Sequence, residues 1–281
     1  MEFKSTSRPS PIAGTWYLGD PSALGIQIDS FINDAKVSKD DVPEEIIGLV
    51  APHAGYCYSG KTAGYAYKTI QGRKIDLVVI LSPYHQYISS DMITTAHQAF
   101  KTPLGTIPVD MSALNDCERI LKEEGILIRQ ISNDTEHSLE IQLPFLQQSL
   151  GPQIKLLPLM IRSMDSKLLR KAADAIFEVI EGRSFLIIAS TDLSHFFSLQ
   201  IAEQMDAEML RRIKSMDAES VLSAEKTGEA SACGASAVAV MLWITKKAGA
   251  KKAYILNYST SADSTGDKTS VVGYGAAAVV L

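Results

Sequence analysis

The stretch S-F-L-I-I-A-S-T-D-L-S-H, residues 184–195, places an aspartate and a histidine directly after a short apolar run. The run at residues 185–189 is nearly continuous rather than alternating, which is typical of a strand buried on both faces of a parallel sheet. Ligands of open α/β sheets bind beyond the carboxyl ends of the strands. Two interpretations of Asp192 and His195 are therefore open. Either Asp192 caps the next helix and His195 packs beside it, or both belong to a functional site at that edge of the sheet.

Similar apolar runs recur along the chain and alternate with segments of helical spacing. Predicted strands cover residues 46–51, 75–81, 91–96, 154–161, 185–189, 253–258 and 271–280. Predicted helices cover residues 60–70, 112–124, 166–181, 201–215 and 234–248. The alternation predicts an α/β fold in which helices cover a mostly parallel or mixed sheet. A turn expected at residues 102–105, between short antiparallel pieces, is the reason to consider a mixed sheet.

Composition favours one ordinary globular domain over residues 1–281, with 46% hydrophobic and 21% charged residues and no linker-like segment. The formal net charge of -5 offers no positive field for nucleic acid or an anionic membrane. The N-terminal residues carry charges and prolines where a signal peptide needs an apolar core. The three cysteines form no C-x-x-C pair, which suits a reducing compartment. We therefore expect a cytoplasmic protein.

Two further strands place a histidine just beyond their ends. His53 follows the strand predicted at residues 46–51, and His85 follows the strand predicted at residues 75–81. A single histidine after a strand is more often a packed or capping residue than a ligand. Because three strand ends together bring metal-competent side chains to one expected edge of the sheet, we predict that these residues share a site.

Two other residues could belong to this site. Cys233 immediately precedes the helix predicted at residues 234–248, where the helix dipole is expected to favour its thiolate, so it is a candidate ligand or nucleophile. His137 lies in D-T-E-H-S-L-E, close to two glutamates, but the pattern does not fix its place in the fold. Cys117 is interpreted as structural, and Cys57 either packs under its loop or faces the site.

Seven stretches carry a family resemblance when taken in order. They are A-G-T-W-Y (13–17), A-P-H-A-G-Y-C-Y-S-G (51–60), S-P-Y-H (82–85), T-P-L-G (102–105), E-H-S-L-E-I-Q-L-P-F (136–145), S-T-D-L-S-H (190–195) and A-C-G (232–234). The chain thereby resembles, over nearly its whole length, the Memo family, whose prokaryotic members are often labelled AmmeMemoRadiSam system protein B. That family is similar in fold to class III extradiol dioxygenases, non-haem iron enzymes built as a three-layer α/β/α sandwich.

The resemblance implies a metal-binding pocket. His53 and His85 match the two metal-binding histidines of those dioxygenases, and Cys233 stands at the position of their third ligand, a glutamate. A set of two histidines and a cysteine is softer than the dioxygenase set and suits iron, copper or zinc, with iron expected first.

Further roles follow from the same resemblance. His195 corresponds to the acid/base histidine, Asp192 would orient or polarise a neighbour, and His137 would complete the polar wall of the pocket.

Three functions remain open at this point. The first is a metal-dependent, dioxygenase-like oxidoreductase acting on an unknown small molecule. The second is a zinc-assisted hydrolase, in which the metal lowers the pKa of bound water. The third is a non-catalytic module that binds metal or peptide, since some eukaryotic relatives are described as adaptors in motility signalling. Protein partners of the AmmeMemoRadiSam type are expected from the same resemblance, and neither nucleic acid nor a membrane is.

Overall fold

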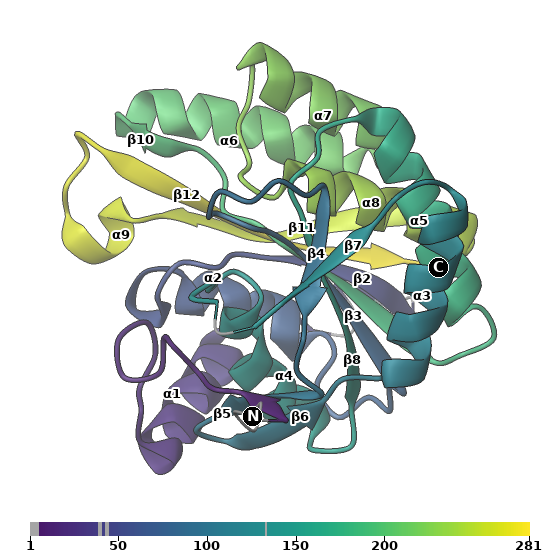
Figure 1. Cartoon of the computed structure of the whole chain (residues 1–281). Helices are drawn as coiled ribbons and strands as arrows, with labels where there is room; N and C mark the ends of the chain where they lie inside the picture. The colour runs from purple at the N-terminus through teal and green to yellow at the C-terminus, as the bar shows by residue number, and fades with distance from the viewer. Residues whose placement is uncertain (1–5, 39–40, 43–44, 133) are drawn as a thin grey trace.

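The centre of the molecule is a mixed β-sheet (Figure 1), seen in a computed structural model that describes residues 6–38, 41–42, 45–132 and 134–281. In these parts of the chain the strand order is β10-β12-β2-β9-β3-β8-β4-β7, and β11 also pairs with β12. The bounds are β2 Ile46–Ala51, β3 Leu77–Pro83, β4 Met92–Thr95, β7 Ile128–Ile131, β8 Lys155–Ile161, β9 Phe185–Ser190, β10 His195–Phe197, β11 Lys252–Thr260 and β12 Val271–Val280. Strands β2, β9, β3 and β8 are parallel, whereas β12 runs antiparallel to β2, and β4 antiparallel to β8.

The central strands are buried on both faces, as their continuous apolar sequences predict. Every residue of β2 and β3 is buried, and so is β9 from Leu186 onward. The seven predicted strands correspond to β2, β3, β4, β8, β9, β11 and β12, with ends that agree within two residues. The predicted α/β class with a mixed sheet is confirmed.

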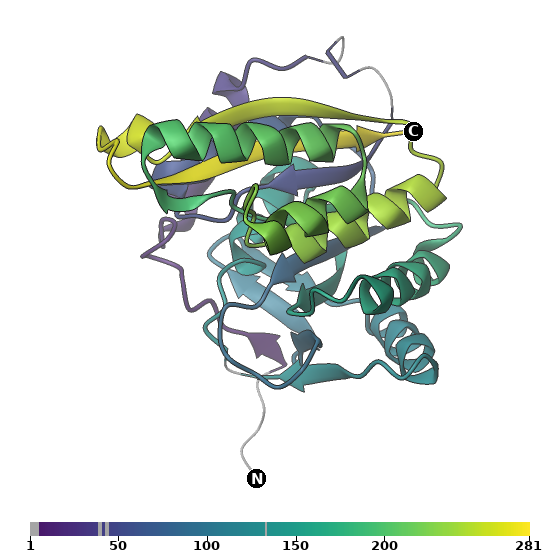
Figure 2. The same cartoon turned by 90° about the horizontal axis from the view of Figure 1, so that it is seen from above.

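Helices lie on both sides of this sheet (Figures 1 and 2). Their bounds are α1 Pro21–Asp34, α2 Tyr56–Lys68, α3 Met111–Glu123, α4 Leu143–Leu150, α5 Ser166–Ile180, α6 Leu199–Lys214, α7 Ala218–Thr227, α8 Ala235–Lys247 and α9 Ala262–Thr265. Helix α2 packs on β2, β11 and β12 beside α1 and α4, while α8 packs against β2, β3 and β9 beside α5 and α7. Figure 2 shows α6 lying along β11 and β12. No helix within the described ranges is long and apolar enough to cross a membrane.

The turn predicted at residues 102–105 is present, but it lies outside the main sheet. It joins β5 (Ala99–Thr102) to β6 (Gly105–Pro108), which pair antiparallel, and β1 (Ser7–Arg8) adds to β5 to complete a small sheet. The main sheet is mixed for a different reason, namely the antiparallel directions of β12 and β4.

The order of the parallel strands positions the candidate site. Strands β2, β9 and β3 are direct neighbours, and the register pairs Ala51 with Ser190 and Ala189 with Leu81. Their carboxyl ends therefore lie side by side at the same height. Residues that immediately follow these strands must meet at one edge of the sheet.

Candidate functional site

His53 lies two residues beyond β2, and its side chain is buried. Its Nδ1 is 3.1 Å from Ser190 Oγ at the end of β9. The Ser190 hydroxyl donates its single proton to the Ser138 carbonyl over 2.6 Å, so it can only accept a hydrogen bond from His53. Nδ1 of His53 must therefore carry the ring proton, and Nε2 keeps a free lone pair.

A buried amide, Gln142, fixes this arrangement. Its Nε2 donates to Ser190 Oγ over 2.7 Å and to the Pro52 carbonyl over 3.0 Å. Its Oε1 accepts from the Tyr67 hydroxyl over 2.8 Å. Because both ends of the amide are occupied, Gln142 holds the end of β9 and the segment after β2 in one relative position.

His85 follows β3 and is oriented by a buried carboxylate. Its Nδ1 is 2.9 Å from Glu136 Oε1, and its backbone N–H donates to Oε2 over 2.6 Å. Burial of Glu136 opposes ionisation, but the hydrogen bonds that it accepts from His85 and from the Ser138 N–H outweigh burial and hold the pKa of this carboxyl well below its usual range. An ionised carboxylate can only accept, so His85 also carries its proton on Nδ1 and leaves Nε2 free.

His137 completes a group of three histidines. Its ring lies between the rings of Trp16 and His85, with centroid separations of 4.1 and 4.7 Å. Burial lowers the pKa of His137 to about 4, which keeps the ring neutral at physiological pH. One ring nitrogen from each of His53, His85 and His137 lies within 4.8 Å of the others. Neutral imidazoles grouped in this way could hold a metal ion.

Cys233 contacts one histidine of this group, His53, but is not itself within the group. Its Sγ is 3.1 Å from His53 Nε2. The following residue, Gly234, allows this approach, because a Cβ there would lie 2.4 Å from the Ser190 carbonyl oxygen. The expectation that the dipole of α8 favours the thiolate is not supported, since burial, followed by the charge of Asp192, raises the pKa of the thiol well above its usual range. Desolvation outweighs the helix dipole at this position.

Asp192 lies at the same edge but does not cap a helix. The next element is the short strand β10, and the following helix, α6, has Ser198 at its N-cap. Asp192 is buried, and its Oδ1 accepts the backbone N–H of His53 over 2.7 Å. Burial raises its pKa to about 7. The side chain therefore holds the backbone of the segment that carries His53.

His195 is half-buried and begins β10, where it pairs with Val272 of β12. It is not part of the histidine group defined above. Burial lowers its pKa.

A comparison with known proteins identifies the family. A family model described as Memo-like protein matches residues 8–278. The chain belongs to the Memo family. It is 35% identical over 271 residues to a MEMO1 family protein of Nitrosopumilus maritimus, covering 96% of this chain and 98% of that one. It is 33% identical over 279 residues to a MEMO1 family protein of Saccharolobus solfataricus, covering 95% and 96% of the two chains.

Four residues of this Memo-family site were not predicted from the sequence. Glu136, Ser190 and Gln142 orient the histidines, and Trp16 stacks on one of them. All four lie inside the stretches that carry the family resemblance. Their proximity to His53, His85 or His137 in space was the missing information.

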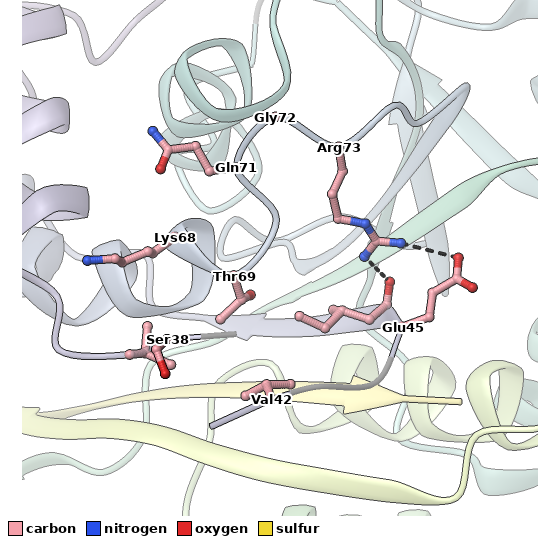
Figure 3. Close-up of a pocket in the computed structure, with 10 residues that line it drawn as sticks. Ser38, Val42, Glu45, Lys68, Thr69, Gln71, Gly72 and Arg73 are labelled. Atoms are coloured by element: carbon pink, nitrogen blue, oxygen red, sulfur yellow. Dashed lines mark hydrogen bonds and ion pairs between the residues drawn. The ribbon is translucent and has the colours of Figure 1, made fainter. Parts of the chain in front are cut away.

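A separate pocket lies away from the histidines (Figure 3). This cavity of about 650 Å³ is lined by Ile46, the first residue of β2, and by Lys68, the last residue of α2. It therefore opens at the amino end of β2, opposite the histidines. The basic side chains that line this pocket already have partners, since Lys68 donates to the Ala35 carbonyl and Arg73 pairs with Glu45. We do not assign the candidate function to this pocket.

Proposed function

We propose that this Memo-family chain binds a transition-metal ion through His53, His85 and Cys233 and acts as a metal-dependent oxidoreductase on a small hydroxyl-bearing molecule. The observation that carries the proposal is the hydrogen-bond partner that each of the two histidines has at Nδ1. Ser190 and Glu136 each bind an Nδ1–H, so both Nε2 atoms are left as lone-pair donors. Metal-binding histidines usually have such partners on the second ring nitrogen.

One pair of the proposed donors has the separation expected of two ligands on one ion. Ligand atoms bound at roughly 2.0 Å for nitrogen and 2.3 Å for sulfur are separated by about 3 to 3.5 Å when they share an ion. The separation of 3.1 Å between His53 Nε2 and Cys233 Sγ falls in this interval. The mixed imidazole and thiol set suits iron or copper, and also zinc. Iron is our first choice because of the resemblance to the extradiol dioxygenases.

The remaining residues have separate roles in this proposal. Bound iron or copper would supply redox chemistry and Lewis acidity to the pocket. His195 takes a proton from the substrate hydroxyl and returns it later, which suits a histidine whose pKa is lowered from its ordinary value by burial. Asp192 positions His53 through its backbone, and His137, held between Trp16 and His85, forms a wall of the site. The formal net charge of -5 favours a small-molecule enzyme over a nucleic-acid or membrane protein, and the cytoplasm is part of the proposal.

Metal analysis of the anaerobically purified protein tests the ligand set. We expect about one equivalent of iron or copper in the wild type and loss of that metal in His53→Ala and Cys233→Ser. His137→Gln should retain it. If His137→Gln loses the metal while Cys233→Ser keeps it, the three histidines are the ligands instead. Stoichiometric zinc would favour the hydrolase, and absence of any metal would favour a non-catalytic module.

A second experiment separates catalysis from metal storage. Oxygen uptake is screened across small hydroxylated compounds, and the His195→Ala variant is then assayed on any substrate found. The variant should keep its metal and lose turnover by roughly 10² to 10⁴, the usual contribution of a positioned proton-transfer group. Loss of metal would make His195 a ligand, and full activity would remove it from the chemistry.

A further inference from the structure

A second pocket lies beside the residues that carry the histidine group. It has a volume of about 610 Å³, within the range of roughly 300 to 1,000 Å³ found for small-molecule sites. Four aromatic side chains line it, from segments far apart in the sequence: Trp16, Tyr58, Phe196 and Tyr274. Its wall thus offers several ring faces and edges to a ligand.

Three contacts connect this pocket to the candidate metal site. Trp16 lines the pocket, and its ring is also stacked on His137 at 4.1 Å. Ala54, another lining residue, directly follows His53. Phe196 directly follows His195, and their ring centroids are 5.7 Å apart. The histidines therefore lie directly behind residues that line the pocket.

Phe196 lies at a bulge-like irregularity in the pairing of β10 with β12, between His195 and Phe197. Its φ is 65°, in the left-handed region that side chains other than glycine rarely adopt, and it remains 75% exposed. An exposed phenyl ring gains little from the core, so burial does not account for the unfavourable backbone. Unfavourable backbone conformations of this kind concentrate at ligand sites. The strained residue presents its ring at the rim of the pocket.

The charges around the pocket limit the ligands that fit. Within the described residues no lysine, arginine or histidine lines it, so an anionic group would have no partner there. Its single acidic side chain, Asp267, already accepts the backbone and side-chain donors of Thr269 over 2.8 and 2.7 Å. The lining therefore favours an uncharged, flat and largely apolar group.

We infer that this pocket binds the uncharged aromatic part of the substrate, with its hydroxyl directed toward the histidines. That the substrate hydroxyl is the reacting group rests on the proposed function. That the rest of the substrate is aromatic rests on the lining of the pocket. A ring held against Trp16 and Phe196 would be placed beside His195, the proposed proton acceptor.

Calorimetric titration with 2-naphthol and 2-naphthoate tests the inference on the full chain at neutral pH. The two probes have the same ring system, but only the second is anionic. The protein is first treated with a chelator, so that the carboxylate cannot bind a metal instead. We expect naphthol to bind at least about tenfold more tightly than naphthoate, because a buried carboxylate would lack a partner. Equal affinities would overturn the inference.

Variants locate the probe. Phe196→Gly and Trp16→Ala should each weaken naphthol binding by about tenfold or more, because each removes a ring face from the pocket. Phe197→Ala, on the neighbouring residue outside the pocket, should bind like the wild type. Phe196→Gly should melt at the same temperature as the wild type or higher, since glycine tolerates the positive φ. Unchanged affinity in both pocket variants would exclude this site.

The two proposals can fail separately. His53→Ala should lose its metal and still bind naphthol. A protein that takes up no metal but binds naphthol with the expected variant pattern would refute the metal site and keep the pocket. Naphthol binding that disappears on chelation, with no effect of Phe196→Gly, would place the ring at the metal and refute the pocket.

Discussion

At the scale of single residues, the site depends on where one hydroxyl proton goes. Ser190 gives its proton to the Ser138 carbonyl, and this obliges the His53 ring to donate from Nδ1. The same oxygen also accepts from Gln142, so its hydrogen-bonding capacity is filled. The orientation of the His53 ring after β2 is thus decided by Ser190 at the end of β9 and by Ser138 and Gln142, which are all far away in the sequence.

The first prediction is that Ser190→Ala weakens metal binding by roughly 10- to 100-fold, the usual cost of losing the partner of a metal-binding histidine. Without Ser190 Oγ, the His53 ring can rotate or change tautomer. The metal affinity is measured by competition with a chromophoric chelator. Ser149→Ala, a buried serine on α4 away from the histidines, is the matched control. Equal losses in both variants would mean that the effect is general destabilisation.

The sequence predicted the metal-competent residues better than their partners. His53, His85 and Asp192 follow buried strands, a pattern visible in the sequence, and the structure brings them to one edge. Ser190 and Glu136 belong to residue types that are common at surfaces and in turns, so no local pattern marks them as partners. The position of Cys233 just before a helix was predicted correctly, but the expected lowering of its thiol pKa was wrong. Burial raises that pKa, and the sequence at a helix start does not show whether a side chain is buried.

At the scale of elements, strands were easier to predict than some helices. The central strands have continuous apolar sequences, which are typical of a sheet with helices packed on both of its faces. Helix α1 was not predicted, although Asp20 caps it, Pro21 begins it, and Leu24, Ile28 and Ile32 form its buried stripe. Such a narrow stripe is a weak signal by periodicity alone. The residues at the start of α1, Asp20 and Pro21, were the stronger evidence in the sequence.

The second prediction concerns the contact between α1 and α2. A Cβ at Gly64 would lie 2.4 Å from the Phe31 carbonyl oxygen, which is backbone and cannot swing aside. Gly64→Ala should therefore lower the free energy of unfolding by about 1 to 3 kcal/mol through overpacking, despite the better helix propensity of alanine. Chemical denaturation measures the change.

Gly25→Ala on α1 provides the control for that experiment. Its nearest neighbour would be Gln148 Oε1 at 3.9 Å, an ordinary contact. The substitution should stabilise by up to about 1 kcal/mol, because propensity acts without a clash. If both variants shift stability in the same direction, the close approach of the two helices is not what requires glycine.

The third prediction uses Asp206 of α6, which is buried and joins three elements. Its Oδ1 accepts the Ser194 N–H over 2.8 Å before β10, and its Oδ2 accepts the Tyr258 hydroxyl of β11 over 2.8 Å. Burial raises its pKa above the ordinary value. The folded state then binds this proton more tightly than the unfolded state, so the contribution of Asp206 to stability falls as pH rises from about 4, the ordinary value, through the folded pKa.

Asp206→Asn removes this titration, so its stability relative to the wild type should increase as pH rises from acid to neutral. Denaturation of both proteins across that range gives the difference. Asp267→Asn should show the opposite sign, because hydrogen bonds from Thr269 lower the pKa of Asp267. A difference independent of pH for Asp206→Asn would show that the group titrates alike in both states.

At the scale of the whole molecule, the site exists because β2, β9 and β3 are neighbours. Sequence patterns predict that parallel strands end at one edge, but they do not give the strand order. In this chain β9, which comes late in the sequence, lies between β2 and β3. The α8 start that carries Cys233 is held to the end of β9 by the Gly234 N–H, which donates to Thr191 Oγ1 over 2.8 Å. The topology therefore joins four distant segments.

The last prediction follows from this topology. A metal ion bound by His53, His85 and Cys233 would link β2, β3 and the start of α8, segments that separate when the chain unfolds. Metal at about 100 times its dissociation constant should then raise the free energy of unfolding by about 2.7 kcal/mol, if the unfolded chain does not bind it. The melting temperature of chelator-treated protein should rise by several degrees on adding metal. His53→Ala should show no such rise, whereas Phe197→Ala should show all of it. His53 is the proposed ligand that follows β2, so without it the ion would no longer link β2 to β3 and α8. An undiminished rise in the melting temperature of His53→Ala would therefore mean that the stabilising ion binds elsewhere.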